Sequence, residues 1–214
     1  MDRGRLEAFS DGVFAVAITL LALNLAVAGP GHGTLAHQLT DQWPAFVAYA
    51  ISFFTIGIIW VNHHALFRTV PAVDRALVFL NLLLLFFVVA IPFATGTMAT
   101  YLRHGGSDAR LAMAVFAGVF EGMSLAFAAV FLYVVGRRLL AVRLTPSMAR
   151  AATLRFTIGN AAYLVSIGVA FASPSAALAI AGAVAVYYMF ERTPTATPDG
   201  SASFPSKADE DEGC

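Results

Sequence analysis

Polar side chains that could take part in chemistry interrupt the first three apolar stretches of this sequence. Asp11 lies in the first stretch, the adjacent pair His63 and His64 lies in the second, and Asn81 lies in the third. An ionisable group inside an apolar membrane segment is energetically costly, so its presence suggests a function. Because histidine titrates near neutral pH, Asp11, His63 and His64 have the composition of a proton relay.

The spacing of these residues from the charged ends of their segments puts them at one depth. Asp11 and Asn81 each follow an arginine by six residues, which is about 9 Å along a helix. His63 and His64 precede an arginine by five and four residues, about 6–7.5 Å. Hydrocarbon offers no hydrogen-bond partner, so these side chains should contact one another. The predicted buried network consists of Asp11, Ser10, His63, His64 and Asn81, with Trp60 one turn deeper.

Such a network has three interpretations: a metal site, a proton relay or a structural lock. Adjacent histidines on a helix point about 100° apart, and only one carboxylate is near, so we predict no metal site. A relay through Asp11, His63 and His64 remains open. We favour a hydrogen-bonded lock between the first three helices, because Asp11 points away from the apolar stripe of its own helix.

That apolar stripe follows Asp11 along the first segment. Val16, Leu20 and Leu23 lie about 140°, 180° and 120° around the helix from Asp11. Val27 continues the spacing of i, i+4, i+7 and i+11. Thr19 lies at the edge of the stripe. A stripe of this kind is typical of helix packing or lipid contact, but apolar rings also form the constrictions of some channels.

Composition indicates a membrane protein. The chain has 214 residues, of which 59% are hydrophobic and 12% are charged, whereas soluble domains average about 25% charged residues. The net charge is zero, so nothing indicates a nucleic-acid partner. The single cysteine, Cys214, excludes a disulfide within the chain. The sequence has no phosphate-binding loop, zinc-protease motif or nucleophile–base pair, so we do not expect an enzyme.

The sequence predicts an all-α, polytopic membrane protein with six transmembrane helices. Each of six stretches is close to the roughly 20 apolar residues that span a bilayer. Their cores lie near 8–28, 44–66, 77–100, 111–135, 152–172 and 174–191. Together they form one membrane domain, 1–192, and we expect the acidic tail 193–214 to be disordered. With six spans, ten Lys and Arg residues fall on the side of the termini and two on the other side, which predicts cytoplasmic termini.

Three motifs resemble the transmembrane protein 175 family of potassium channels. The first is Arg5, Phe9, Ser10 and Asp11, followed by Thr19-Leu20-Leu21. The second is Trp60-x-x-His63-His64-x-x-Phe67, and the third is Asn81-Leu82. The resemblance covers about residues 3–192, with the motifs in the same order.

This resemblance implies a potassium-permeable homotetramer in a prokaryotic cytoplasmic membrane, with potassium as the permeant ion and no cofactor. In the family the first helix lines the pore, and apolar rings replace a re-entrant selectivity-filter loop. The main ring, commonly Ile or Leu, corresponds to Val16, and Leu20 and Leu23 form the next rings. Thr19 resembles the threonine near the constriction. The resemblance also implies that Arg5, Phe9, Ser10 and Asp11 pack against Trp60 and the histidines.

Two alternatives to a potassium channel remain. One is a proton channel or proton-coupled transporter that uses Asp11, His63 and His64. The other is a membrane scaffold that transports nothing.

Overall fold

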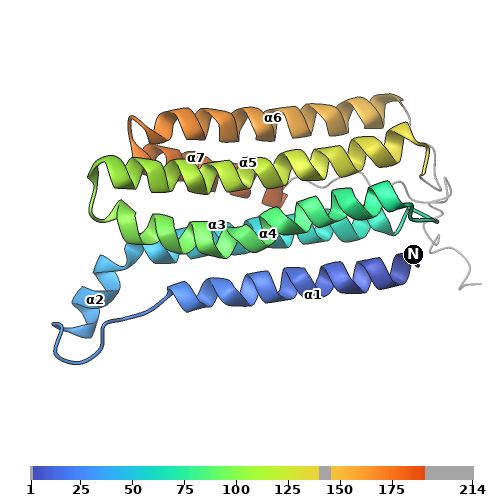
Figure 1. Cartoon of the computed structure of the whole chain (residues 1–214). Coiled ribbons are helices and arrows are strands. Elements are labelled where there is room, and N and C mark those ends of the chain that lie inside the picture. Colours follow the sequence, from blue (N-terminus) through green and yellow to red (C-terminus); the bar gives the residue numbers. More distant parts are fainter. Residues whose placement is uncertain (1, 140–145, 191–214) are drawn as a thin grey trace, which may run out of the picture.

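The computed structural model describes residues 2–139 and 146–190, and the regular secondary structure of this part is entirely helical. The long helices lie side by side in a bundle, with α1 at one edge and α6 at the opposite edge (Figure 1). The elements are α1 (Arg3–Leu21), the short 3₁₀ helix η1 (Ala22–Asn24), α2 (Leu35–Asp41), α3 (Trp43–Phe67), α4 (Arg75–Leu102), α5 (Gly106–Gly136), α6 (Pro146–Ala170) and α7 (Pro174–Phe190).

Four of these helices are long and apolar enough to cross a membrane. They are α1 with η1, α3, α4 and α5, and the mean hydropathy of their most apolar windows runs from 1.8 to 2.8. The predicted fifth and sixth segments correspond to α6 and α7, and α7 is a shorter apolar helix of 17 residues. The chain is therefore an all-helical membrane protein, as predicted. The predicted tail 193–214 lies outside the described residues.

The first helix ends earlier than predicted, and this changes one predicted site residue. The α-helix stops at Leu21 and the chain leaves helical geometry after Asn24. The Asn24 side-chain amide donates to the carbonyl of Pro92 on α4 at 3.0 Å, so the end of the helix is fixed by a tertiary contact. Val27 follows this point and is not part of the helical stripe. The short helix α2 was also not predicted.

One side of α1 packs against α3 and α4. The buried residues recur every three or four positions, which is the period of a helix face. They are Leu6, Ser10, Phe14, Ala17 and Leu21. The opposite side of α1 remains exposed along the whole helix. This arrangement fixes which way the stripe after Asp11 faces.

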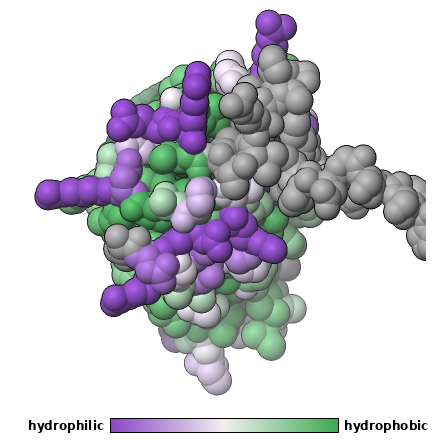
Figure 2. Space-filling model, turned by 90° about the vertical axis from the view of Figure 1, so that its right-hand side faces the viewer, coloured by the Kyte–Doolittle hydropathy of each residue, from purple (hydrophilic) through white to green (hydrophobic). Residues whose placement is uncertain are grey.

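Arginines collect at the end of the bundle where the chain begins. Figure 2 looks onto this end, where hydrophilic side chains gather among apolar ones. Asp74 precedes α4 here and caps it by accepting from the backbone N–H of Leu77 at 2.8 Å. The Tyr133 hydroxyl also donates to the Asp74 carboxylate, and these two bonds hold the pKa of Asp74 below its ordinary value. The arginines of this end are Arg3, Arg5, Arg68, Arg75, Arg137 and Arg138.

Close packing of α4 against α5 depends on a glycine. A Cβ atom at Gly122 would lie 2.2 Å from the Phe87 ring carbon Cε1, whereas a Cβ at Gly118, one turn earlier, would meet nothing within 4 Å. The ring of Phe87 therefore occupies the space that any other residue at 122 would need.

We predict opposite effects of the same substitution at these two glycines. Gly122→Ala forces the Phe87 ring to move and should cost about 1–3 kcal/mol of stability. Gly118→Ala should be neutral or stabilise the helix by about 0.5–1 kcal/mol, because alanine loses less backbone entropy. The midpoint of thermal unfolding in mild detergent measures both. Equal midpoints for the two variants would contradict the packing described here.

Candidate functional site

Three buried polar side chains from α1, α3 and α4 form one continuous hydrogen-bond chain. His63 Nε2 lies 2.7 Å from Asn81 Oδ1, and the Asn81 amide nitrogen donates to the Ser10 hydroxyl at 2.9 Å. The Ser10 hydroxyl in turn donates to the backbone carbonyl of Leu6 at 2.9 Å. All three side chains are fully or almost fully buried. Since Asn81 Oδ1 accepts, the proton on His63 is assigned to Nε2.

Aromatic rings hold the His63 imidazole in place. The ring of Phe67 stacks on the imidazole with 4.2 Å between centroids. The ring of Phe14, which belongs to α1, has its centroid 5.4 Å from that of the imidazole. A buried polar network is stable only where each member has a partner, and rings that fix the imidazole keep its hydrogen bond aligned. His63 is thus positioned by residues of its own helix and of α1.

Asp11 takes part in a different contact. The Trp60 indole nitrogen donates to Asp11 Oδ1 at 2.9 Å, and the His64 ring stacks against Trp60 at 6.1 Å between centroids. His64 Nδ1 is buried, and no residue of the described part forms a hydrogen bond with it. The expected single network is therefore two groups: Ser10, His63 and Asn81 in the core, and Asp11, Trp60 and His64 nearer the surface.

The geometry does not link the three residues of a possible proton relay. Among the described residues, no hydrogen bond joins Asp11 to His63 or His64. The chain from His63 passes through an amide, Asn81, and ends at a backbone carbonyl, neither of which exchanges protons readily near neutral pH. The hydrogen bonds of the described residues hold three helices together, and they form no continuous chain from Asp11 to either histidine.

The start of α1 is tied to the end of α3 by an arginine that the sequence analysis missed. Arg3 pairs with Glu7 at 3.3 Å and donates to the backbone carbonyl of Arg68 at 3.3 Å. The sequence did contain a signal for this ion pair, because Arg3 and Glu7 are four residues apart and so lie on the same side of a helix. Arg5 and Phe9 instead face outward, so the packing implied for them stays a prediction.

The candidate pore residues are exposed: Val16, Thr19 and Leu20 on α1, Leu23 on η1, and Val27 in the loop that follows. Val16 is 55% exposed, Leu20 39% and Leu23 75%, although they belong to a helix with a well-packed opposite side. Thr19 is exposed beside them, and its hydroxyl donates to the Val16 carbonyl at 2.8 Å. Val27 is 47% exposed but lies in the loop after η1. One helix thus presents an apolar face with a single hydroxyl at its edge.

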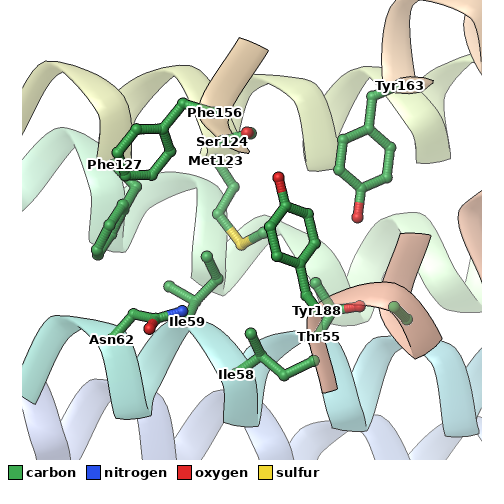
Figure 3. A pocket seen from close by; sticks show the side chains of 11 residues that line it. Thr55, Ile58, Ile59, Asn62, Met123, Ser124, Phe127, Phe156, Tyr163 and Tyr188 are labelled. Carbon is green, nitrogen blue, oxygen red and sulfur yellow. The ribbon is translucent and has the colours of Figure 1, made fainter. Parts of the chain in front are cut away.

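A cavity lies elsewhere in the bundle, among α3, α5, α6 and α7. Tyr163 and Tyr188 point into it beside the sulfur of Met123, and Phe127 and Phe156 close one end (Figure 3). The Tyr188 hydroxyl donates to the backbone carbonyl of Arg155 at 2.7 Å. The described residues contain no cluster of three His, Cys, Asp or Glu side chains suited to a metal ion. None of the predicted site residues lines this cavity.

Comparison with known proteins connects this geometry to a family. The family model described as the endosomal/lysosomal potassium channel TMEM175 matches residues 5–92, which contain both polar groups and the exposed face of α1. A protein of Streptomyces collinus that is named a potassium channel is 45% identical over 94% of this chain and 98% of its own length. The chain belongs to the TMEM175 family.

A solved structure of a TMEM175 relative has the same fold. The crystal structure of the homolog from Chamaesiphon minutus, titled a lysosomal potassium-selective channel homolog, superposes with a TM-score of 0.76 at 35% identity. The match covers 87% of this chain and 96% of that one. Human TMEM175, named a proton channel, is 38% identical over 49% of this chain, and the match spans 22% of the human protein. The named members of the TMEM175 family are thus ion channels rather than enzymes.

The hydrogen-bond chain makes a prediction about stability. Asn81→Leu should cost about 1–3 kcal/mol, because it leaves the buried His63 Nε2 without a partner. Adding His63→Phe to that variant removes the unpaired nitrogen and should restore part of the loss, since replacing both partners by apolar groups can be nearly neutral. Thermal unfolding midpoints of the single and double variants in detergent measure this. If the two losses simply add, the side chains are not coupled.

Proposed function

We propose that this chain is the subunit of a potassium-permeable channel, and that four copies of α1 line its pore. The observation that carries the proposal is the division of α1 into two sides. One side is fixed to α3 and α4 through Ser10 and Phe14, and the other exposes Val16, Leu20 and Leu23. Bacterial relatives that match this chain over most of its length and are named potassium channels support the same conclusion.

The position of α1 is the reason to propose several copies. In the described part, α1 lies at the edge of the bundle, and its exposed face encloses nothing within one chain (Figure 1). A pathway needs walls on all sides, and symmetric rings of identical subunits provide them. Each chain contains the first motif once and so contributes one pore-lining helix. A pore enclosed by four such helices therefore needs four subunits around one axis.

Small residues beside the apolar stripe favour close approach of neighbouring α1 helices. Small side chains let helix backbones pack tightly in membranes, where no hydrophobic force drives helices together. The exposed small residues of α1 adjacent to the stripe are Ala8, Gly12, Ala15 and Thr19. No other residue of this structure lies within 4 Å of a Cβ built at Gly12.

In this assembly, rings of Val16, Leu20 and Leu23 form the constriction. Apolar rings restrict ion flow because a narrow apolar passage excludes water. Valine is smaller than the Ile or Leu common at this position of the family. The narrowest point of the pore is therefore either shifted to the Leu20 ring, or it stays at the Val16 ring and is wider than in those relatives. Thr19 adds a hydroxyl near the ring, and Val27 lines the mouth beyond η1.

We further propose six transmembrane helices in one domain, 1–192, with no re-entrant filter loop and with 193–214 as a separate tail. Helix α6 has 25 residues and α7 has 17, lengths of about 37 and 25 Å, within the range that spans a bilayer. The arginine-rich end of the bundle carries the start of the chain, which supports cytoplasmic termini in a prokaryotic cell membrane.

Reconstitution tests the channel proposal. Purified protein in liposomes should conduct potassium down its gradient without ATP, light or another energy source. The same sample should contain four chains per particle by light scattering in mild detergent. Background potassium permeability from a stable four-chain particle would reject the potassium channel and leave a proton channel or a scaffold.

Proton conduction through the same pore is the second candidate, because vertebrate relatives are named proton channels. A pH-sensitive dye inside potassium-free liposomes distinguishes the two. Proton flux with background potassium flux would favour the second candidate. Because Asp11 bonds to Trp60 and His63 bonds to Asn81, His63 is not expected to carry protons to or from Asp11. Proton flux through the pore should therefore persist in His63→Phe.

The pore stripe makes a separate prediction. Val16→Asn or Leu20→Asn should raise single-channel conductance several-fold and weaken selectivity, because a polar ring retains water in the constriction. Planar-bilayer recordings measure both effects.

Matched controls exist on other helices. Val89 on α4 is 49% exposed and Leu125 on α5 is 52% exposed, similar to Val16 and Leu20. Val89→Asn and Leu125→Asn should leave conductance unchanged. If all four variants conduct alike, Val16 and Leu20 do not line the pore.

A further inference from the structure

The short helix α2 has two exposed sides of opposite character. Leu35 is 62% exposed and Leu39 is 40% exposed, and their spacing of four residues puts them on one side. His37 and Asp41 lie on roughly the opposite side, where His37 Nε2 and Asp41 Oδ2 are exposed and 3.3 Å apart. Exposing two leucine side chains to water costs free energy, so a surface that covers this side of α2 would stabilise it.

The depth of α2 points to the membrane surface. Arg103 donates to the backbone carbonyl of Asp41, the last residue of α2, at 3.4 Å. Arg103 directly follows α4, which is uncharged from Ala76 to Leu102. The first charge after a long apolar span marks where hydrocarbon gives way to head groups. The C-terminal end of α2 therefore lies at the level of that boundary, at the end of the bundle opposite the N-terminus (Figure 1).

The apolar surface of α2 continues onto the membrane-spanning helices. Trp43 follows Leu39 by four residues, is exposed, and begins α3. It also lines an apolar groove between α3 and α7, together with Val47 and Phe54. Tryptophan is enriched at membrane–water interfaces. Exposed apolar side chains thus lie both on α2 and at the start of the membrane span that follows it.

We propose that α2 is an interfacial helix whose Leu35 and Leu39 insert into the bilayer surface. A helix with an apolar side in the head-group boundary and a charged side in water lies in the plane of the membrane. His37 and Asp41 are its only titratable residues and they pair, so apolar burial rather than attraction to anionic lipid holds it there. The proposal requires a membrane around α3 and α4, but it does not depend on potassium conduction.

This anchor also fixes the segment that follows the first helix. The Gln38 side chain accepts from the backbone N–H of Gly29 at 3.1 Å and donates to its carbonyl at 2.9 Å. The Gln42 side chain donates to the carbonyl of Ala26 at 2.8 Å. The loop is thereby tied to α2, or to the residue after it, on each side of Val27: at Ala26 and at Gly29. Lipid contact at Leu35 and Leu39 is then transmitted to the end of α1.

Site-specific labelling tests the proposal. Cys214 is the single cysteine, so Cys214→Ser gives a background in which Leu39→Cys and His37→Cys each carry one environment-sensitive NBD label. Both variants are reconstituted in phosphatidylcholine vesicles, with and without lipid that bears a nitroxide near the top of the acyl chain. Leu35→Cys serves as a second probe of the apolar face if a label at 39 disturbs folding, as judged by gel filtration.

The label at position 39 should emit at shorter wavelength, lose much of its intensity to nitroxide lipid, and be quenched several-fold less by iodide than the label at 37. Adding anionic lipid should change neither result. Equal iodide quenching at 37 and 39 would overturn the proposal. Protection from both iodide and nitroxide lipid at 39 would also overturn it, because protein, as in a second copy of the chain, would then cover this face.

Discussion

Hydrocarbon offers no hydrogen-bond partner to a buried polar group, and where α1, α3 and α4 meet, Asn81 supplies the partner for His63 and Ser10. Its amide has one oxygen and one nitrogen, and it uses them to bind α3 through His63 and α1 through Ser10. No other side chain of the three helices bonds to both neighbours in the described residues. The rotation of α1 about its own axis follows from this contact, because Ser10 must face α4.

Fixing the rotation of α1 separates its structural residues from the residues that we propose line a pore. Ser10 turns inward, and the positions left outside carry Val16, Leu20 and Leu23. In this reading, the polar residues of the first motif are scaffolding for the apolar ones. Side chains that look suited to proton transfer instead fix which side of α1 is exposed, and so fix the geometry of the proposed pore.

Counting residues from charged ends brought Ser10, His63 and Asn81 to one depth, because the rise of a helix is constant. The same count could not separate Asp11 and His64 from that group, since depth gives no information on which neighbour a side chain faces. The structure shows that Asp11 faces Trp60, whose indole nitrogen donates to the Asp11 carboxylate. The end of α1 depends on the contact of Asn24 with the distant backbone of Pro92, which no local pattern encodes. Helix α2 has a local signal that the sequence analysis missed, because Thr34 caps it by accepting from the backbone N–H of His37.

The first helix is held at three levels along its length. Arg3 fastens its start to α3, Ser10 joins it to α4 near the first third, and Asn24 fastens its end to α4. A helix restrained in this way can slide or turn alone only if these bonds break. Any widening of the proposed pore that keeps them intact has to tilt α1, α3 and α4 as a single rigid body. The hinge of such a motion would then lie outside these three helices, at their boundary with the rest of the bundle.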